Sequence, residues 1–343
     1  MATEPLFAVF ANYRYRFLVQ WKRLMPALIF LVLLAAFWGE VLRRNLQSQI
    51  GGHVLSAFIC FGLLLAGEWF FGFGIGEWLA RRLSGDSLRA RLIRVLTPIL
   101  FVLPYLVFAI PRHTFEFRYL LGMALFPVIC ASTIEFSSRA QKLLWQDIVV
   151  LPALALTLEL RVFSGAWPYN GLGSLPKIYL ADVALYVYLV VRRIEGMGYS
   201  LVPRLDAFVI GLREWVFFLP IALGLGFALH FISFFPRHPS IGHIALALVV
   251  VFFLTAVPEE IFFRGILQNL LEGRYGRRTA LLMTSALFGL SHFHKGATFN
   301  WRYVILAAIA GIFYGRAWRA RRRVPASSTA HTLVDVVWGL WFR

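Results

Sequence analysis

The sequence predicts an all-α fold, a polytopic bundle of transmembrane helices with about eleven spans. Three observations predict it: 59% of the residues are hydrophobic, the mean hydropathy is +0.71, and the apolar residues come in runs of about 16 to 25. Soluble domains are roughly 45–50% apolar, and a membrane helix needs about 20 mostly apolar residues. No polar stretch exceeds about 25 residues, so no separate soluble domain is expected.

The expected spans differ in character along the chain. The first six contain prolines that can kink a helix, whereas the later ones contain most of the polar motifs described below. Residues 196–212 form the most polar connection of any length, and they predict a junction between an N-terminal bundle, 1–200, and a C-terminal unit, 201–343. In order, the spans are expected at 24–42, 54–80, 95–111, 119–136, 146–163, 177–191, 214–235, 243–271, 279–294, 303–318 and 324–342.

The net charge of +17 is compatible with nucleic-acid binding, but its distribution indicates membrane topology instead. The N-terminal tail and alternate connections carry 23 of the 34 Lys and Arg residues, and the other side carries 10. The positive-inside rule then places the N-terminus in the cytoplasm and the C-terminus outside. The basic residues are expected to face anionic lipid, so no nucleic-acid partner is predicted. Arg outnumbers Lys 30 to 4, which favours a bacterial cell membrane.

Two glutamates and an arginine, Glu259, Glu260 and Arg264, lie inside the eighth expected span. A charge at bilayer depth costs roughly 2.5–3.5 kcal/mol on the insertion scale, and such residues indicate a functional site. Residues four apart share one helix face, so Glu260 is expected to pair with Arg264. Glu259 points about 100° away and is expected to lack that partner.

Two further motifs, Phe288-Gly-Leu-Ser-His292 and His331-Thr-Leu-Val-Asp335, lie in the ninth and eleventh expected spans. Counted at about 1.5 Å per residue, Glu259 and these side chains fall near the middle of the hydrocarbon layer. They are therefore expected to meet in one polar cavity, where a glutamate and histidines can activate a water and stabilise an oxyanion. Small residues are expected to let the helices approach closely; they are Gly265, Gly289, Gly311 and Gly315.

These motifs, in this order on successive membrane helices, resemble the CAAX protease and bacteriocin-processing (CPBP/Abi) family of intramembrane endopeptidases. The resemblance covers about residues 205–343 and does not extend to residues 1–200. It implies that Glu259 polarises a water with His292 as its partner. It also implies that Glu260 and Arg264 shape the site, and that His331 and Asp335 form the oxyanion side.

The resemblance leaves metal dependence open, because the family has been discussed both as metal-dependent and as glutamate-type. A metal-free site is favoured. A zinc ion would be held by Glu259, His292 and His331, although the chain lacks a His-Glu-x-x-His helix. Prenyl-protein proteases carry asparagine at the last motif position, where this chain has Asp335. An ionised aspartate cannot donate a hydrogen bond, so Asp335 must be protonated or must orient His331 instead.

Alternative functions remain open from the sequence. Ser291 is adjacent to His292, but neighbouring residues on a helix point about 100° apart, so a Ser–His pair is expected to be poorly aimed. A non-catalytic immunity or scaffold protein would keep the fold without the motif residues. A proton-coupled transporter would use Glu68, Glu77 and the paired glutamates. For a peptidase, the expected partner is a membrane-associated peptide or protein, such as a prenylated tail, a bacteriocin leader or a C-terminal membrane anchor.

Overall fold

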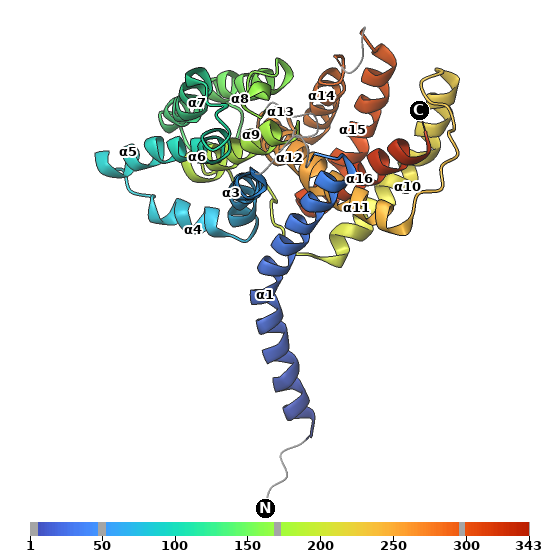
Figure 1. The fold of residues 1–343 in the computed structure, drawn as a ribbon, viewed down its shortest axis with the longest axis horizontal. Helices are drawn as coiled ribbons and strands as arrows, with labels where there is room; N and C mark the ends of the chain where they lie inside the picture. The colour runs from blue at the N-terminus through green and yellow to red at the C-terminus, as the bar shows by residue number, and fades with distance from the viewer. Residues whose placement is uncertain (1–5, 47–52, 168–172, 295–298, 343) are drawn as a thin grey trace, which may run out of the picture.

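The computed structural model describes residues 6–46, 53–167, 173–294 and 299–342, with side chains from Leu24 onward. Within these ranges the chain is almost wholly helical, and its β structure is limited to one isolated bridge between Phe234 and Phe342. Figure 1 shows the helices packed into one body, from which the first helix extends. The predicted all-α class is confirmed.

Apart from α1, which extends from the body, the chain up to Val191 forms the helices that lie around α9 in Figure 1. Among them, η2 and η3 are 3-10 turns, and η4 is a π-helical continuation of α9. These elements are α1 (Leu6–Arg43), α3 (Val54–Gly72), α4 (Ile75–Arg82), α5 (Leu88–Leu96), η2 (Thr97–Val102), α6 (Leu103–Ala109), α7 (Phe117–Glu135), α8 (Trp145–Glu159), η3 (Ser164–Ala166), α9 (Leu175–Leu185) and η4 (Tyr186–Val191).

The rest of the chain contains four long helical segments and the functional motifs. The segment 241–275 is continuous but contains two π-helical stretches, η5 and η6. The elements are α10 (Leu205–Ala228), α11 (Ile241–Val251), η5 (Phe252–Ala256), α12 (Val257–Glu260), η6 (Ile261–Gln268), α13 (Asn269–Tyr275), α14 (Arg277–Leu290), α15 (Trp301–Arg321) and α16 (Val324–Trp341).

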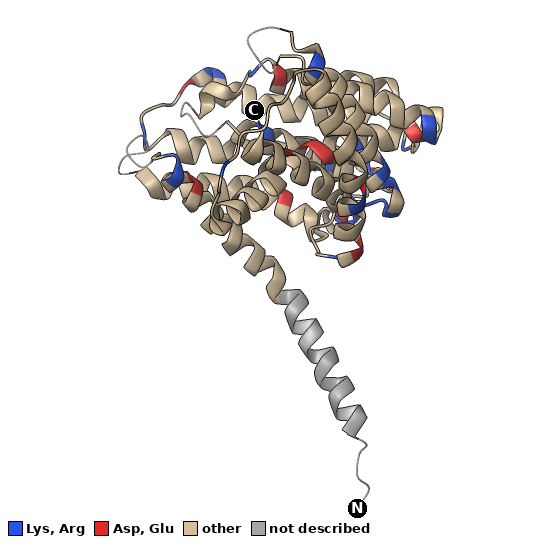
Figure 2. Cartoon of the chain, turned by 90° about the vertical axis from the view of Figure 1, so that its right-hand side faces the viewer, with Lys and Arg blue, Asp and Glu red and all other residues tan. Residues whose placement is uncertain are grey.

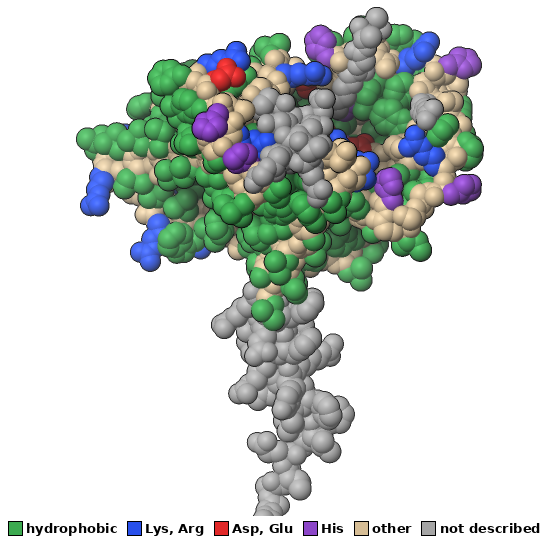
Figure 3. Space-filling model, viewed as in Figure 1, with side chains coloured by type: hydrophobic (Ala, Val, Ile, Leu, Met, Phe, Trp, Pro, Cys, Tyr) green, Lys and Arg blue, Asp and Glu red, His purple; other side chains and the backbone are tan. Residues whose placement is uncertain are grey.

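Six described segments are long and apolar enough to cross a membrane, namely 24–43, 54–72, 88–109, 117–135, 205–228 and 241–275. Large apolar side chains cover much of the surface, as Figure 3 shows, and include the exposed Leu55, Phe136 and Ile241. Lys and Arg gather toward the edges of the helical body in Figure 2. The chain is therefore a multi-pass membrane protein. The other five expected spans are helical but shorter or less hydrophobic.

One expected span is interrupted. Residues 54–80 were expected to form a single helix, but α3 ends at Gly72 and α4 begins at Ile75. The cause is Gly74, whose φ of +88° lies in the left-handed region. Such a residue cannot continue a right-handed helix, and glycine adopts this conformation without a steric penalty.

The centre of the body is α9 with η4, whose residues 178–188 are all buried. A helix that is apolar on every side is stable only when other elements surround it. Buried apolar residues on both sides of residue 200 form one continuous cluster, and α9 contacts both α12 and η6. The burial of α9 in the core therefore holds the start of this helix against the segment that contains Glu259.

Candidate active site

Glu260 and Arg264 form a fully buried ion pair, as their spacing predicts. Arg264 Nη1 lies 3.0 Å from Glu260 Oε1, and Arg264 Nη2 donates to the carbonyl of Gly311 at 3.2 Å. A Cβ at Gly311 would lie only 3.0 Å from Ser285 Cα and 3.3 Å from Arg264 Nη2. A side chain there would push Ser285 or the guanidinium by a few tenths of an ångström, so glycine favours the close approach of α15 to α14 and Arg264.

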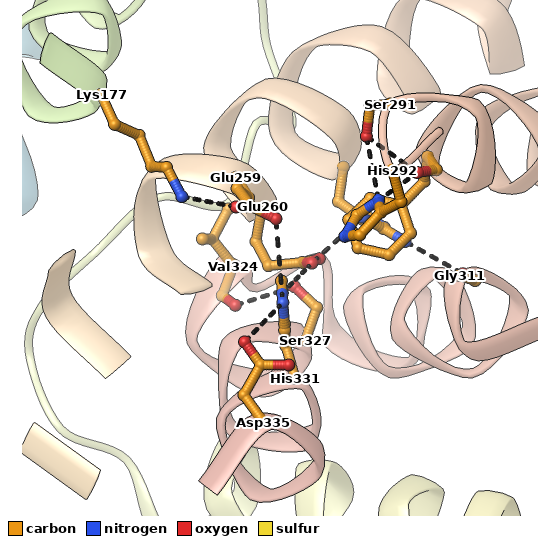
Figure 4. Close-up of polar contacts among 12 residues, drawn as sticks. Lys177, Glu259, Glu260, Ser291, His292, Gly311, Val324, Ser327, His331 and Asp335 are labelled. Atoms are coloured by element: carbon orange, nitrogen blue, oxygen red, sulfur yellow. Dashed lines mark hydrogen bonds and ion pairs between the residues drawn. The ribbon is translucent and has the colours of Figure 1, made fainter. Parts of the chain in front are cut away.

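His331 is the hub of the site, as Figure 4 shows. Its Nδ1 lies 2.9 Å from Glu260 Oε1, and its Nε2 lies 3.8 Å from Glu259 Oε2 and 3.5 Å from Asp335 Oδ2. The ring stacks on Tyr314 with centroids 4.7 Å apart. Because a carboxylate only accepts hydrogen bonds, His331 donates its Nδ1–H to Glu260. This bond fixes the ring and directs Nε2 toward Glu259 and Asp335.

Glu259 has a cationic partner from another helix, which the sequence analysis did not consider. Lys177 Nζ, at the start of α9, donates to Glu259 Oε1 at 2.6 Å, and both side chains are largely buried. The sequence analysis considered only Arg264, on the same helix, as a partner of Glu259. The second carboxylate oxygen of Glu259 is the one that faces His331.

His292 lies just beyond the end of α14 and is buried. Its Nδ1 is 2.8 Å from the carbonyl oxygen of Phe288, which can only accept, so Nδ1 carries the proton and the basic lone pair of the neutral ring is on Nε2. The ring packs against Phe288 and Tyr303, with centroids 4.8 and 4.7 Å away.

The expectation that Ser291 is poorly aimed at His292 was wrong, because Ser291 Oγ lies 3.2 Å from His292 Nδ1. The helical angle does not apply, since α14 ends at Leu290 and both residues follow its end. The Ser291 hydroxyl nevertheless donates to the Phe288 carbonyl at 2.8 Å. With His292 Nδ1 also bound to that carbonyl, the contact does not provide a base for Ser291.

Two cavities meet the site. The larger one, of about 930 Å³, is lined by Lys177, Glu259 and His292 and by residues of α8 and α9. The smaller one, of about 100 Å³, is mostly apolar and is lined by His292, His331 and Asp335. His292 thus lines both cavities, and Glu259 lines the larger one. Space for a peptide segment and a water exists on the Glu259 side.

The donor arrangement does not fit the zinc set. Among the residues described, no three His, Cys, Asp or Glu side chains converge closely enough to hold a metal ion. Glu259 Oε1 is directed to Lys177, and His331 Nδ1 is directed to Glu260. Glu259, His292 and His331 share one region but not a common coordination centre.

The structure therefore brings Glu259, Glu260, Arg264, His331 and Asp335 into direct contact and places His292 on the same cavity as Glu259. Sequence analysis missed Lys177. The only local signal was a lysine at the start of an otherwise apolar span, and its partner is 82 residues away.

Residues 241–337 match the family model "Type II CAAX prenyl endopeptidase Rce1-like". The match is narrower than the range of the sequence resemblance. It includes all six residues that the resemblance placed in the site, namely Glu259, Glu260, Arg264, His292, His331 and Asp335. No curated protein and no solved structure matches the chain. The matched range agrees with the predicted family resemblance. Lys177 lies outside it, before its first residue.

Proposed function

We propose that this chain, with its Rce1-like domain at residues 241–337, is an intramembrane endopeptidase that hydrolyses a peptide bond of a membrane-associated peptide or protein. One observation carries the proposal: Glu259 and His292, from two different segments, line the same cavity, and His331 from a third approaches Glu259 within 3.8 Å. Cleavage by the purified full chain, and its loss on Glu259→Gln, tests this function.

In the proposed reaction a water bound between Glu259 and His292 attacks the carbonyl carbon of the scissile bond. Glu259 accepts the water proton as general base, and the new C–O bond leaves negative charge on the carbonyl oxygen. A protonated His331 donates its Nε2–H to that oxyanion. The oxyanion then returns to a carbonyl as the C–N bond breaks, and the proton held by Glu259 passes to the departing amine. The products are a carboxylic acid terminus, which loses its remaining proton to solvent, and an amine terminus.

The remaining polar residues hold this arrangement. Glu260 accepts from both Arg264 and His331 through the same oxygen, so it keeps His331 Nε2 directed at the site. Asp335 lies 3.5 Å from His331 Nε2, which supports a role in orienting His331. Donation by Asp335 itself would need a protonated carboxyl.

Lys177→Met is expected to lower the cleavage rate by roughly 10- to 100-fold, because Glu259 loses the cation that fixes one of its oxygens and a misplaced catalytic group costs about that much. Lys177→Arg keeps the charge and is expected to retain more activity than Lys177→Met. Rates measured on purified variants of equal thermal stability check this. Equal rates for Lys177→Met and the unmodified chain would contradict it.

We also propose that residues 1–200 form a supporting bundle around the peptidase unit, 201–343. Lys177 and the α8 residues that line the larger cavity come from that bundle. The bundle then contributes one wall of the site and its only lysine contact among the described residues, which gives it a role that the family resemblance does not assign.

We propose that the chain crosses a bacterial cell membrane eleven times, with the N-terminus in the cytoplasm, and that the larger cavity opens outward. The cavity lining includes Arg161, Ser164 and His294, which lie at the ends of expected spans five and nine, the outer ends under this topology. An outward opening favours substrates such as C-terminal membrane anchors of exported proteins. Comparison of protein N-termini in cells with and without the chain would identify them.

Cysteine labelling checks this topology. Ser164→Cys is expected to react with a membrane-impermeant maleimide in intact cells, whereas Ser84→Cys is expected to react only after lysis. Both serines are exposed, and the native Cys60 and Cys130 are buried, which keeps the background low. The reverse labelling pattern would overturn the proposed orientation.

A proton-coupled transporter is less well supported. Glu77 is exposed and lies near Arg81, and Glu68 is buried near Asp182. Glu259 is instead engaged by Lys177 and His331. A non-catalytic scaffold would not require the buried polar contacts of His331 with Glu259, Glu260 and Asp335. These contacts fix the orientation of one imidazole ring.

A further inference from the structure

A third cavity, of about 860 Å³, lies away from the candidate active site and is strongly basic. Its lining contains three carboxylates, Glu77, Glu195 and Asp206, and twice as many arginines, which leaves an excess of positive charge. The arginines come from separate parts of the chain and are Arg81, Arg193, Arg204, Arg321, Arg322 and Arg323.

Two of these arginines serve the fold, because they are bound to fixed partners. Arg193 Nη2 donates to the Leu83 carbonyl at 2.8 Å, and Arg322 Nη2 lies 2.7 Å from Glu272. They define the walls of the cavity and hold α4 and the end of α15 in place.

Arg204 is engaged by Asp206, to which its Nε and Nη2 each donate at 3.2 Å. The remaining three arginines keep donor capacity toward the cavity. Arg81 and Arg321 are 70% and 65% exposed, and their nearest carboxylates lie at 3.8 and 3.9 Å. Arg323 donates to the Val202 carbonyl, but within the described residues its buried Nε has no acceptor. Exposed ion pairs of this kind contribute little to stability, so these guanidinium groups can turn to a better anion without a large cost.

The floor of the cavity is rigid. Gly198 has a φ of +73°, and a Cβ there would overlap the carbonyl of Arg322. Val324 N donates to the Gly198 carbonyl at 2.9 Å, and Trp318 Nε1 donates to the Met197 carbonyl at 3.0 Å. The loop before α10 and the turn before α16 are therefore held together by these bonds. Their backbone positions the arginines of the cavity even without a ligand.

We propose that this cavity binds phosphate, presented by the headgroup of an anionic phospholipid. The planar guanidinium fork matches phosphate oxygens, and the volume is within the range of about 300–1,000 Å³ typical of ligand pockets. The lining segments belong to connections predicted to share the cytoplasmic side, where anionic lipids concentrate. The site joins residues on both sides of residue 200, and it does not depend on peptidase activity.

The test compares two double variants of the full chain purified in neutral detergent. Arg81→Ser with Arg321→Ser removes two exposed arginines of the cavity. Arg82→Ser with Arg278→Ser removes two exposed arginines that do not line it. Binding of phosphatidylglycerol, phosphatidylcholine and inorganic phosphate is measured for each by native mass spectrometry and by the shift in melting temperature.

The unmodified chain is expected to bind phosphatidylglycerol in preference to phosphatidylcholine. The cavity variant is expected to bind it about ten- to thirty-fold more weakly, since each arginine near an anionic surface contributes roughly a factor of five, while the control variant stays near the unmodified chain. A loss confined to inorganic phosphate supports the phosphate site but rejects the lipid as its source. Equal binding of both ligands by the two variants would overturn the proposal.

Discussion

Glu259→Gln is expected to lower the rate of peptide cleavage by about 10²–10⁴-fold, the range that a general base contributes. Glutamine has nearly the same shape but cannot accept the proton of the attacking water. Its amide oxygen can still accept from Lys177, whose Nζ lies 2.6 Å from Glu259 Oε1. The substitution therefore removes the base while preserving much of the local packing, and the variant is expected to fold.

Glu159→Gln is a matched control, because Glu159 lines the same cavity but has no place in the proposed reaction. Both variants remove one carboxylate charge from the cavity wall. Cleavage of one membrane-protein substrate is followed for each with purified, equally stable protein. If Glu259→Gln cleaves as fast as the unmodified chain, the peptidase proposal is wrong; if both variants fail equally, the charge of the cavity matters rather than the base.

The parts of the site that the sequence predicted are those set by local geometry or by depth in the membrane. Glu260 and Arg264 pair because residues four apart share a helix face. His331 reaches Glu259 and Glu260, in agreement with the similar membrane depth obtained by counting about 1.5 Å per residue along each span.

Features that depend on the packing of distant helices were not predictable. The partner of Glu259 comes from α9, and only the tertiary arrangement of that buried helix shows that Lys177 is near. The contact between Ser291 and His292 depends on where α14 ends. The break at Gly74 depends on a single backbone angle that an apolar run does not reveal.

The π-helical stretches on either side of Pro258 are another such feature. Proline removes a backbone donor and clashes with the carbonyl four residues earlier, and the π stretch η5 directly precedes the turn that contains Pro258. Stretches of this kind are frequent at functional sites. They alter the direction of neighbouring side chains, and residue spacing alone does not reveal where such stretches occur.

Arg264→Met is expected to destabilise the fold by about 3–5 kcal/mol, the usual cost of removing one partner from a buried ion pair. Both side chains of the pair are fully buried, so Glu260 would keep its charge without the guanidinium that neutralises it. The packing of Phe288, whose ring centroid is 4.5 Å from Arg264 Cζ, would also be lost. The melting temperature of the purified variant, followed by tryptophan fluorescence, measures this loss.

The double variant Glu260→Met/Arg264→Met separates stability from activity. Replacing both members of a buried pair with apolar residues is often neutral, so this variant is expected to recover at least half of the lost stability. Its cleavage rate is expected to stay low, because His331 Nδ1–H loses its acceptor, now 2.9 Å away, and the ring no longer directs Nε2 to the site. Recovery of the cleavage rate together with stability would show that Glu260 serves only the fold, and His331 would then need another source of orientation.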